Sequence, residues 1–153
     1  MIFLEYYPDK ALIKAIGIPK KEIVHAFSKG NVCKKLEKVK RCWGLVDKDP
    51  SSAQPTYMAR LKSHTNEGNI ELLYDEQNKN YLIVLYPELE DWILESAKEV
   101  EVNPTNFGLP NGSNELKKVV NNRLRQFENL IHDIIRKKGK RIITLEGFLK
   151  GKI

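Results

Sequence analysis

The segment Cys42–Pro50 has the residue pattern most suited to chemistry, because its apolar run ends in two carboxylates, Asp47 and Asp49. Such a run, bounded by turn residues, is typical of a strand covered on both faces. If the backbone stays extended, both carboxylates point to one side. At ~4 Å and an effective dielectric of ~20 their repulsion is about 4 kcal/mol, which a proton, a cationic side chain or a divalent cation must offset. The alternative is a solvated acidic turn.

The elements around this segment alternate between strands and helices with short connections. Apolar runs predict strands over residues 1–6, 22–27 and 42–47. Asp9 opens a helix that Gly17 ends, and Asn31 is the predicted N-cap of the next helix. This β-α-β-α-β order predicts an α/β fold of the Rossmannoid kind, with a mostly parallel central sheet flanked by helices.

Ligands of parallel sheets bind outside the carboxyl ends of the strands. Glu5 ends the first predicted strand and Asp47 the third, so both should face one edge of the sheet. Asp9 would lie one helical turn above that edge. The sequence therefore predicts that Glu5, Asp9, Asp47 and Asp49 converge in space.

The middle of the chain predicts a short helix over 56–63, a polar and mobile segment over 64–69, and a hairpin of strands 70–74 and 81–86. Pro87 fits the first position of a following helix. The acids Glu88 and Glu90 then complement the helix dipole, or join the site, because they also follow a strand.

The last part of the chain is basic. Residues 112–153 hold 11 lysines and arginines against 4 aspartates and glutamates, which leaves −1 in residues 1–111 of a total charge of +6. A long amphipathic helix capped at Ser113 is predicted there, and residues 142–149 fit either a helix or an edge strand. We expect residues 1–102 to form the α/β core and 103–153 a basic helical extension packed on it.

The basic helix predicts a polyanionic partner, with a solvated lysine-rich face as the alternative. Its apolar stripe fits either core packing or a dimer contact. The cationic side chains expected to hold a nucleic-acid backbone are Lys29, Lys117, Lys118, Arg123 and Arg125.

Together these acids resemble the Toprim (topoisomerase-primase) domain, in particular that of the overcoming-lysogenization-defect (OLD) nucleases and their small standalone relatives. The resemblance covers about residues 1–95 and rests on Glu5, Asp9, the Asp47-x-Asp49 pair and the acidic segment 87–92, which ends in a tryptophan. Lys29-Gly30-Asn31-Val32 also looks like the turn after the second strand of those relatives. Tyr6 departs from the pattern, which usually has glycine there.

The resemblance implies a Mg²⁺- or Mn²⁺-dependent nuclease or related enzyme that acts on phosphodiester bonds. Oxygen ligands without neighbouring Cys or His also suit Mg²⁺ on chemical grounds. The expected metal ligands are Glu5, Asp47, Asp49 and Glu90, with Glu88 as the alternative to Glu90, and Asp9 completes the catalytic set. The OLD-type ATPase motif is missing, so a separate ATPase partner is one expectation.

The composition also bears on a membrane-spanning protein, on cysteine chemistry and on the rivals to the nuclease. The longest apolar run, residues 81–86, is too short to span a membrane, and two cysteines without metal-ligand spacing suggest reduced thiols in a cytoplasmic protein. The aromatic side chains at positions 6, 7, 43 and 92 are expected in the core or at its rim. Two rivals to the nuclease stay open: a catalytically inactive Toprim-like module that binds nucleic acid or protein, and a structural protein with plain acidic turns.

Overall fold

The computed structural model describes residues 1–151 and contains one six-stranded sheet in the order β2-β1-β3-β6-β5-β4. The strands are β1 (Ile2–Leu4), β2 (Ile23–His25), β3 (Trp43–Asp47), β4 (Lys62–Glu67), β5 (Ile70–Asp75) and β6 (Asn80–Leu85). The first four in spatial order are parallel, and β5 and β4 continue the sheet antiparallel to their neighbours.

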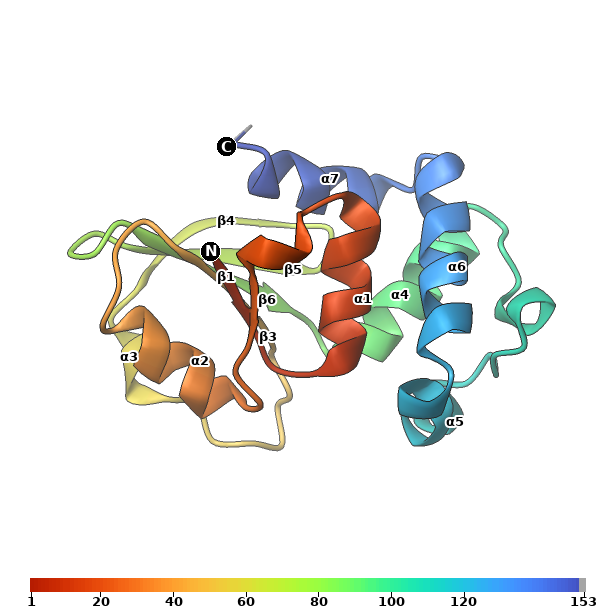
Figure 1. Cartoon of the computed structure of the whole chain (residues 1–153), viewed down its shortest axis with the longest axis horizontal. Helices are drawn as coiled ribbons and strands as arrows, with labels where there is room; N and C mark the ends of the chain where they lie inside the picture. The colour runs from red at the N-terminus through yellow and green to blue at the C-terminus, as the bar shows by residue number, and fades with distance from the viewer. Residues whose placement is uncertain (152–153) are drawn as a thin grey trace.

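Helices cover both faces of this sheet. They are α1 (Tyr7–Ile16), α2 (Lys29–Leu36), α3 (Thr56–Ala59), α4 (Leu89–Glu99), α5 (Ser113–Val119), α6 (Leu124–Arg136) and α7 (Lys140–Leu149), with 3₁₀ turns η1 (Lys20–Glu22), η2 (Pro104–Phe107) and η3 (Val120–Asn122). Figure 1 shows α2 and α3 on one side of the sheet and α1, α4, α6 and α7 on the other. The predicted α/β class with a mostly parallel, helix-flanked sheet is therefore confirmed, and the arrangement is compatible with a Rossmann-like fold.

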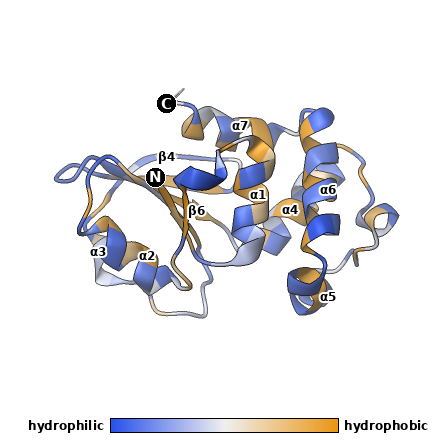
Figure 2. Ribbon diagram, viewed as in Figure 1, coloured by the Kyte–Doolittle hydropathy of each residue, from blue (hydrophilic) through white to orange (hydrophobic). Residues whose placement is uncertain are grey.

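Two hydrophobic clusters hold the layers together. The larger joins Leu12 and Ile13 of α1 to Phe127 and Ile131 of α6, all fully buried. The smaller lies beneath α2 and α3. Figure 2 shows that α6 alternates between apolar and polar stretches, as an amphipathic helix does when one face is buried. Residues from both predicted parts of the chain thus share the larger core.

The start of α1 follows from local hydrogen bonding. The backbone N–H of Tyr6 donates to Asp9 Oδ2 at 2.9 Å, so the carboxylate of the first turn satisfies an N–H that the helix cannot. Gly17 ends the helix with a φ of 107°, a left-handed conformation that glycine adopts without a steric penalty. Both features agree with the helix predicted between Asp9 and Gly17.

The predicted N-cap of α2 was wrong. Ser28 caps the helix, because its Oγ accepts a hydrogen bond from the backbone N–H of Asn31 at 3.0 Å. Asn31 lies in the first turn and uses its side-chain amide to donate to the carbonyl of Ala26 at 2.9 Å. Serine and asparagine are both good caps, and only the path of the chain after β2 selects between them.

The mobile polar segment predicted over 64–69 was also wrong, since residues 62–67 form β4. This strand pairs antiparallel with β5 at the border of the sheet, and most of its side chains are exposed. A polar sequence is compatible with an edge strand, where few side chains need to be buried. The hairpin of β5 and β6 is confirmed.

Four predicted helix limits needed correction. The short helix predicted over 56–63 ends at Ala59, because β4 begins at Lys62. The N-cap of α5 is Gly112 and not Ser113.

Glu88 has extended backbone and is the N-cap of α4, so the helix begins at Leu89 and not at Pro87. The long helix from Ser113 is broken into α5 and α6 by η3, which contains two asparagines, residues whose side chains compete for backbone hydrogen bonds. Residues 142–149, left open between helix and strand, lie in α7.

Candidate acidic site at the carboxyl edge of the sheet

Acidic side chains follow three neighbouring parallel strands. Leu4 of β1 pairs with Leu45 of β3, and Asp47 at the end of β3 pairs with Leu85 at the end of β6. The chain therefore leaves β1, β3 and β6 at one edge of the sheet. Glu5 follows β1 and Asp47 ends β3, so these two acids meet at one edge as predicted. Two further acids, at positions 88 and 90, follow β6 at the same edge.

Asp47 is the centre of this group. Its Oδ1 accepts a hydrogen bond from the backbone N–H of Leu89 at 3.1 Å, which ties the end of β3 to the start of α4. Its own backbone N–H donates to Glu5 Oε1 at 2.8 Å. These two bonds fix Asp47 between the segments that follow β1 and β6.

Asp47, Glu88 and Glu90 form the closest cluster, which we call the acidic trio. Each offers one carboxylate oxygen, and these three oxygens lie within 4.8 Å of one another. All three side chains are half-buried. Such a set of oxygen donors matches what Mg²⁺ or Mn²⁺ accepts.

Glu5 and Asp9 lie beneath the trio and are less accessible. They are 5% and 2% exposed, and one carboxylate oxygen of Asp9 already accepts the Tyr6 N–H at the start of α1. Asp9 is close enough to Glu5 and Glu90 for their charges to act on it. These two carboxylates therefore add negative charge behind the trio, while neither is one of its three members.

The acids of the site resist ionisation. Burial, and then the charges of Asp9, Glu5 and Glu90, raise the pKa of Asp47 to about 9. Burial likewise raises the pKa of Glu5, Asp9 and Glu90, although the Asp47 N–H and the positive charge of Lys29 oppose the shift at Glu5. A divalent cation would offset the same repulsion and displace the protons.

Asp49 is not brought into the trio. The strand ends at Asp47, and Asp49 has a φ of 42°, so the extended backbone assumed for residues 47–49 was wrong. Its carboxylate accepts a hydrogen bond from Ser51 Oγ at 2.7 Å, which lowers the pKa of the group. Asp49 therefore lies at the solvent side of the loop after β3.

Glu88, and not Asp49, is the third member of the trio beside Asp47 and Glu90. The sequence offered Glu88 only as an alternative to Glu90, and in a continuous helix from Pro87 the two would point in different directions. With Glu88 extended as the N-cap and Glu90 in the first turn, both reach Asp47. An acid two residues before another at a strand-to-helix junction was the only sequence signal for this pair.

Of the cationic side chains expected to contact nucleic acid, two belong to the site itself. Lys117 Nζ lies 3.0 Å from Glu88 Oε1 and 3.8 Å from Asp91 Oδ2. Lys29 is 8% exposed, and its Nζ donates to the carbonyl of Lys48 at 2.8 Å and to Ser52 Oγ at 3.4 Å. Lys117 thus borders the trio, and Lys29 holds the loop after β3.

The other three lie on the helical C-terminal part. Arg123 Nη1 donates to the carbonyl of Gly108 at 2.9 Å, so this side chain holds the loop before α5. Lys118 and Arg125 are both exposed. Within residues 1–151, no helix has the length and apolarity needed to cross a bilayer.

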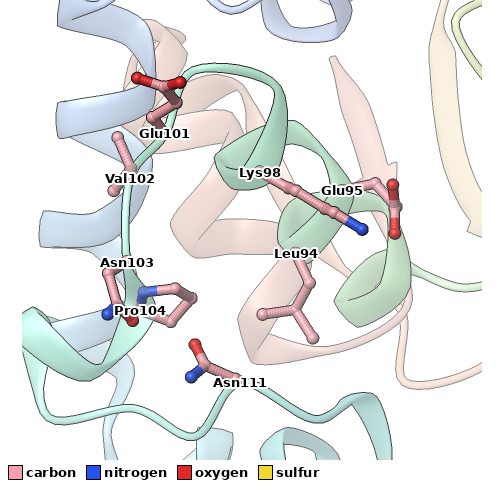
Figure 3. Close-up of a pocket in the computed structure, with 8 residues that line it drawn as sticks. All are labelled: Leu94, Glu95, Lys98, Glu101, Val102, Asn103, Pro104 and Asn111. Carbon is pink, nitrogen blue, oxygen red and sulfur yellow. The ribbon is translucent and has the colours of Figure 1, made fainter.

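A separate hollow lies at the far end of α4. Figure 3 shows Leu94, Glu95 and Lys98 of that helix facing Pro104 and Asn111 across a space of about 480 Å³. No member of the acidic trio lines it, so it is distinct from the site at the sheet edge.

Comparison with known proteins gives no further guide, because no protein-family model, curated protein or solved structure matches the chain. The inference of function therefore depends on the site's own geometry and chemistry.

Proposed function

We propose that this protein is a divalent-metal-dependent nuclease, with Mg²⁺ or Mn²⁺ at the acidic trio and a Toprim-like arrangement of its α/β core. The observation that carries the proposal is the approach of Asp47, Glu88 and Glu90 oxygens to within 4.8 Å of one another at the carboxyl edge of the sheet. Ligand sites of open α/β sheets lie at this edge.

The trio would hold the cation, which when bound supplies Lewis-acid stabilisation of a phosphodiester oxygen and of an attacking water. Glu5 would keep Asp47 in place, since its Oε1 accepts the Asp47 N–H. Asp9 would act from behind, by its charge and by fixing the start of α1. Lys117 would present positive charge to the phosphate at the rim.

Glu90 has two candidate roles, a third ligand or the base that takes the proton of the attacking water. Burial raises its pKa, which moves it toward the range where a carboxylate is an effective base near neutral pH. Glu90→Gln separates the roles: loss of Mn²⁺ affinity identifies a ligand, and retained affinity with lost cleavage identifies a base.

The test is cleavage of labelled single- and double-stranded DNA and RNA with Mg²⁺, Mn²⁺ or EDTA. We expect wild type to cleave with metal and not with EDTA, and Asp47→Asn to lose at least about 100-fold in rate. Glu95→Gln is the matched control, because Glu95 is an exposed acid on the same helix as Glu90 and lines the separate hollow instead of the trio.

No cleavage by wild type with either metal would contradict the proposal. If nucleic acid then binds equally well to wild type and Asp47→Asn, the Toprim-like binding module is the better description. If calorimetry shows no Mn²⁺ binding and the protein has no affinity for nucleic acid, the structural protein with plain acidic turns is the remaining description.

A further inference from the structure

An exposed aromatic cluster lies beside the acidic site and has no part in the chemistry proposed above. Of the five large hydrophobic side chains exposed in residues 1–151, three gather here: Tyr6 and Tyr7 are about half exposed, and Phe27 is 62% exposed. They follow β1 and β2, so they lie at the same edge of the sheet as the trio.

The rings are ordered against one another. His25 and Phe27 stack, with ring centroids 4.0 Å apart and an angle of 21° between their planes. Tyr7 meets His25 edge-on at 4.4 Å. Phe27 thus stacks on one ring while the rest of its surface is open to solvent.

The backbone holds Phe27 in this exposed position at a cost. Its φ is 74°, in the left-handed region that a bulky side chain rarely adopts. Immediately before it, the Ala26 N–H donates to the Leu4 carbonyl at 2.7 Å, and just after it Ser28 caps α2. Strain that leaves a large aromatic ring in water has no evident benefit to stability, and such positions concentrate at binding sites.

Lysines complete the surface. A hollow of about 470 Å³ is lined by His25 and Phe27 on one side and, on the other, by Lys34 and Lys35 of α2 and Lys38 just beyond it. Within residues 1–151, none of these three lysines forms an ion pair with an acid. His25 Nε2 is buried and hydrogen-bonds to no group of residues 1–151.

We propose that Phe27, Tyr7 and these three lysines form a binding platform for single-stranded nucleic acid, in which bases stack on the aromatic rings and Lys34, Lys35 and Lys38 hold the backbone. Stacking on aromatic side chains together with a basic groove is how single strands are bound without regard to sequence. A duplex keeps its bases stacked on each other, so it cannot use the rings.

The platform leads to the acidic site. Tyr6 is adjacent to Tyr7, and its backbone N–H is bonded to Asp9. Tyr6 also directly follows Glu5, whose Oε1 accepts the Asp47 N–H at 2.8 Å, so residues 5–7 join the platform to the trio. The inference deepens the proposed function, on which it rests for its substrate: it makes the substrate a single strand.

The test measures binding in EDTA, so it does not depend on metal or cleavage. Labelled oligothymidylate and oligouridylate, each about 12 nucleotides long, are titrated with protein by fluorescence anisotropy, and a duplex of equal length serves as competitor. We expect the single strands to bind and the duplex to compete poorly. A preference between the two single strands would distinguish DNA from RNA.

The variants separate stacking from charge. Phe27→Ala should weaken binding about tenfold, and Phe27→Tyr should restore it, because a tyrosine ring also stacks. Ile143→Ala is the matched control, since Ile143 is a 52% exposed hydrophobic residue on α7. Its binding should equal that of wild type.

The contribution of charge is tested with a platform triple variant that combines Lys34→Gln, Lys35→Gln and Lys38→Gln. A control triple variant carries the same change at Lys20, Lys21 and Lys79, which are exposed elsewhere. The platform triple variant should reduce the slope of log K against log salt by about 2, and the control should leave it unchanged.

Three results would overturn the platform: wild-type affinity in Phe27→Ala, equal competition by duplex, or no binding of either single strand at low salt. Absence of single-strand binding is also the result expected if this surface docks a protein instead of nucleic acid. Because EDTA is present throughout, these failures are distinct from failure of the cleavage test, in which Asp47→Asn is decisive.

Discussion

Because the carboxylates of the acidic trio repel one another, removing the charge of Asp47 should stabilise the metal-free protein, and this can be tested without a substrate. In Asp47→Asn the new amide side chain keeps an oxygen that can accept the Leu89 N–H, so the hydrogen bond of 3.1 Å survives while the charge is lost. At the 4.8 Å limit of the trio and an effective dielectric of ~20, two ionised carboxylates repel by about 3 kcal/mol. The substitution removes two such pairs from the ionised state.

Part of this repulsion is already relieved in the wild type. Lys117 offsets the charge of Glu88 at 3.0 Å, and the raised pKa of Asp47 means that the folded protein keeps a proton in the cluster. We therefore expect a net stabilisation of about 2 kcal/mol for Asp47→Asn near pH 8 without metal, which for a chain of this size is about 6 °C in Tm.

The pH dependence has a definite sign. The pKa of Asp47 is about 9 in the folded protein and near the ordinary 3.8 in the unfolded chain, so the folded state binds more protons between these values. Stability of the metal-free wild type should therefore be greatest at the acidic end of this window and fall as the pH rises toward 9. The advantage of Asp47→Asn should shrink as the pH falls and disappear only below the unfolded-state pKa of 3.8.

Calorimetric melting of both proteins in EDTA and in about 5 mM Mn²⁺ checks this. Mn²⁺ should raise the Tm of wild type, because binding to the folded state stabilises it, and should raise that of Asp47→Asn much less. Glu95→Gln, an exposed acid on the same helix as Glu90, should follow wild type in both conditions. A lower Tm for Asp47→Asn than for wild type in EDTA near pH 8 would refute the reasoning, as would equal gains from Mn²⁺ in the two proteins.

Two further substitutions test the rim and the core. Lys117→Met removes the ion pair with Glu88; it should destabilise the metal-free protein by up to about 1 kcal/mol but tighten Mn²⁺ binding, measured by titration calorimetry, because Glu88 is freed. Weaker Mn²⁺ binding in that variant would show that Lys117 positions the trio. Gly44→Ala places a Cβ 2.9 Å from methyl groups of Leu36 and Leu82, so denaturant unfolding should show a loss of about 1–3 kcal/mol. An unchanged midpoint would mean that α2 shifts away from the sheet without cost.

The sequence by itself determined the order of the elements and the edge at which chemistry is expected. The apolar runs that became β1, β2 and β3 and the short connections between them predict a parallel sheet, and parallel strands place Glu5 and Asp47 at one border. That part was accessible because it depends on local pattern and on connection length.

Only the tertiary structure decided which acids meet. Asp49 is lost from the cluster because the backbone turns at φ 42°. Glu88 enters it because α4 begins at Leu89 and not at Pro87, with the Leu89 N–H bonded to Asp47. Local sequence could not decide either event, since each depends on how β3 and β6 pair.

The aromatic surface shows the same limit. The tyrosines at the end of β1 were expected at the core or its rim, and Phe27 carried no signal, because a phenylalanine beside a strand is usually buried. The left-handed backbone at Phe27 and the position of α2 bring it beside Lys34 and into water. Exposure is a property of the packed chain, so residue type alone could not reveal it.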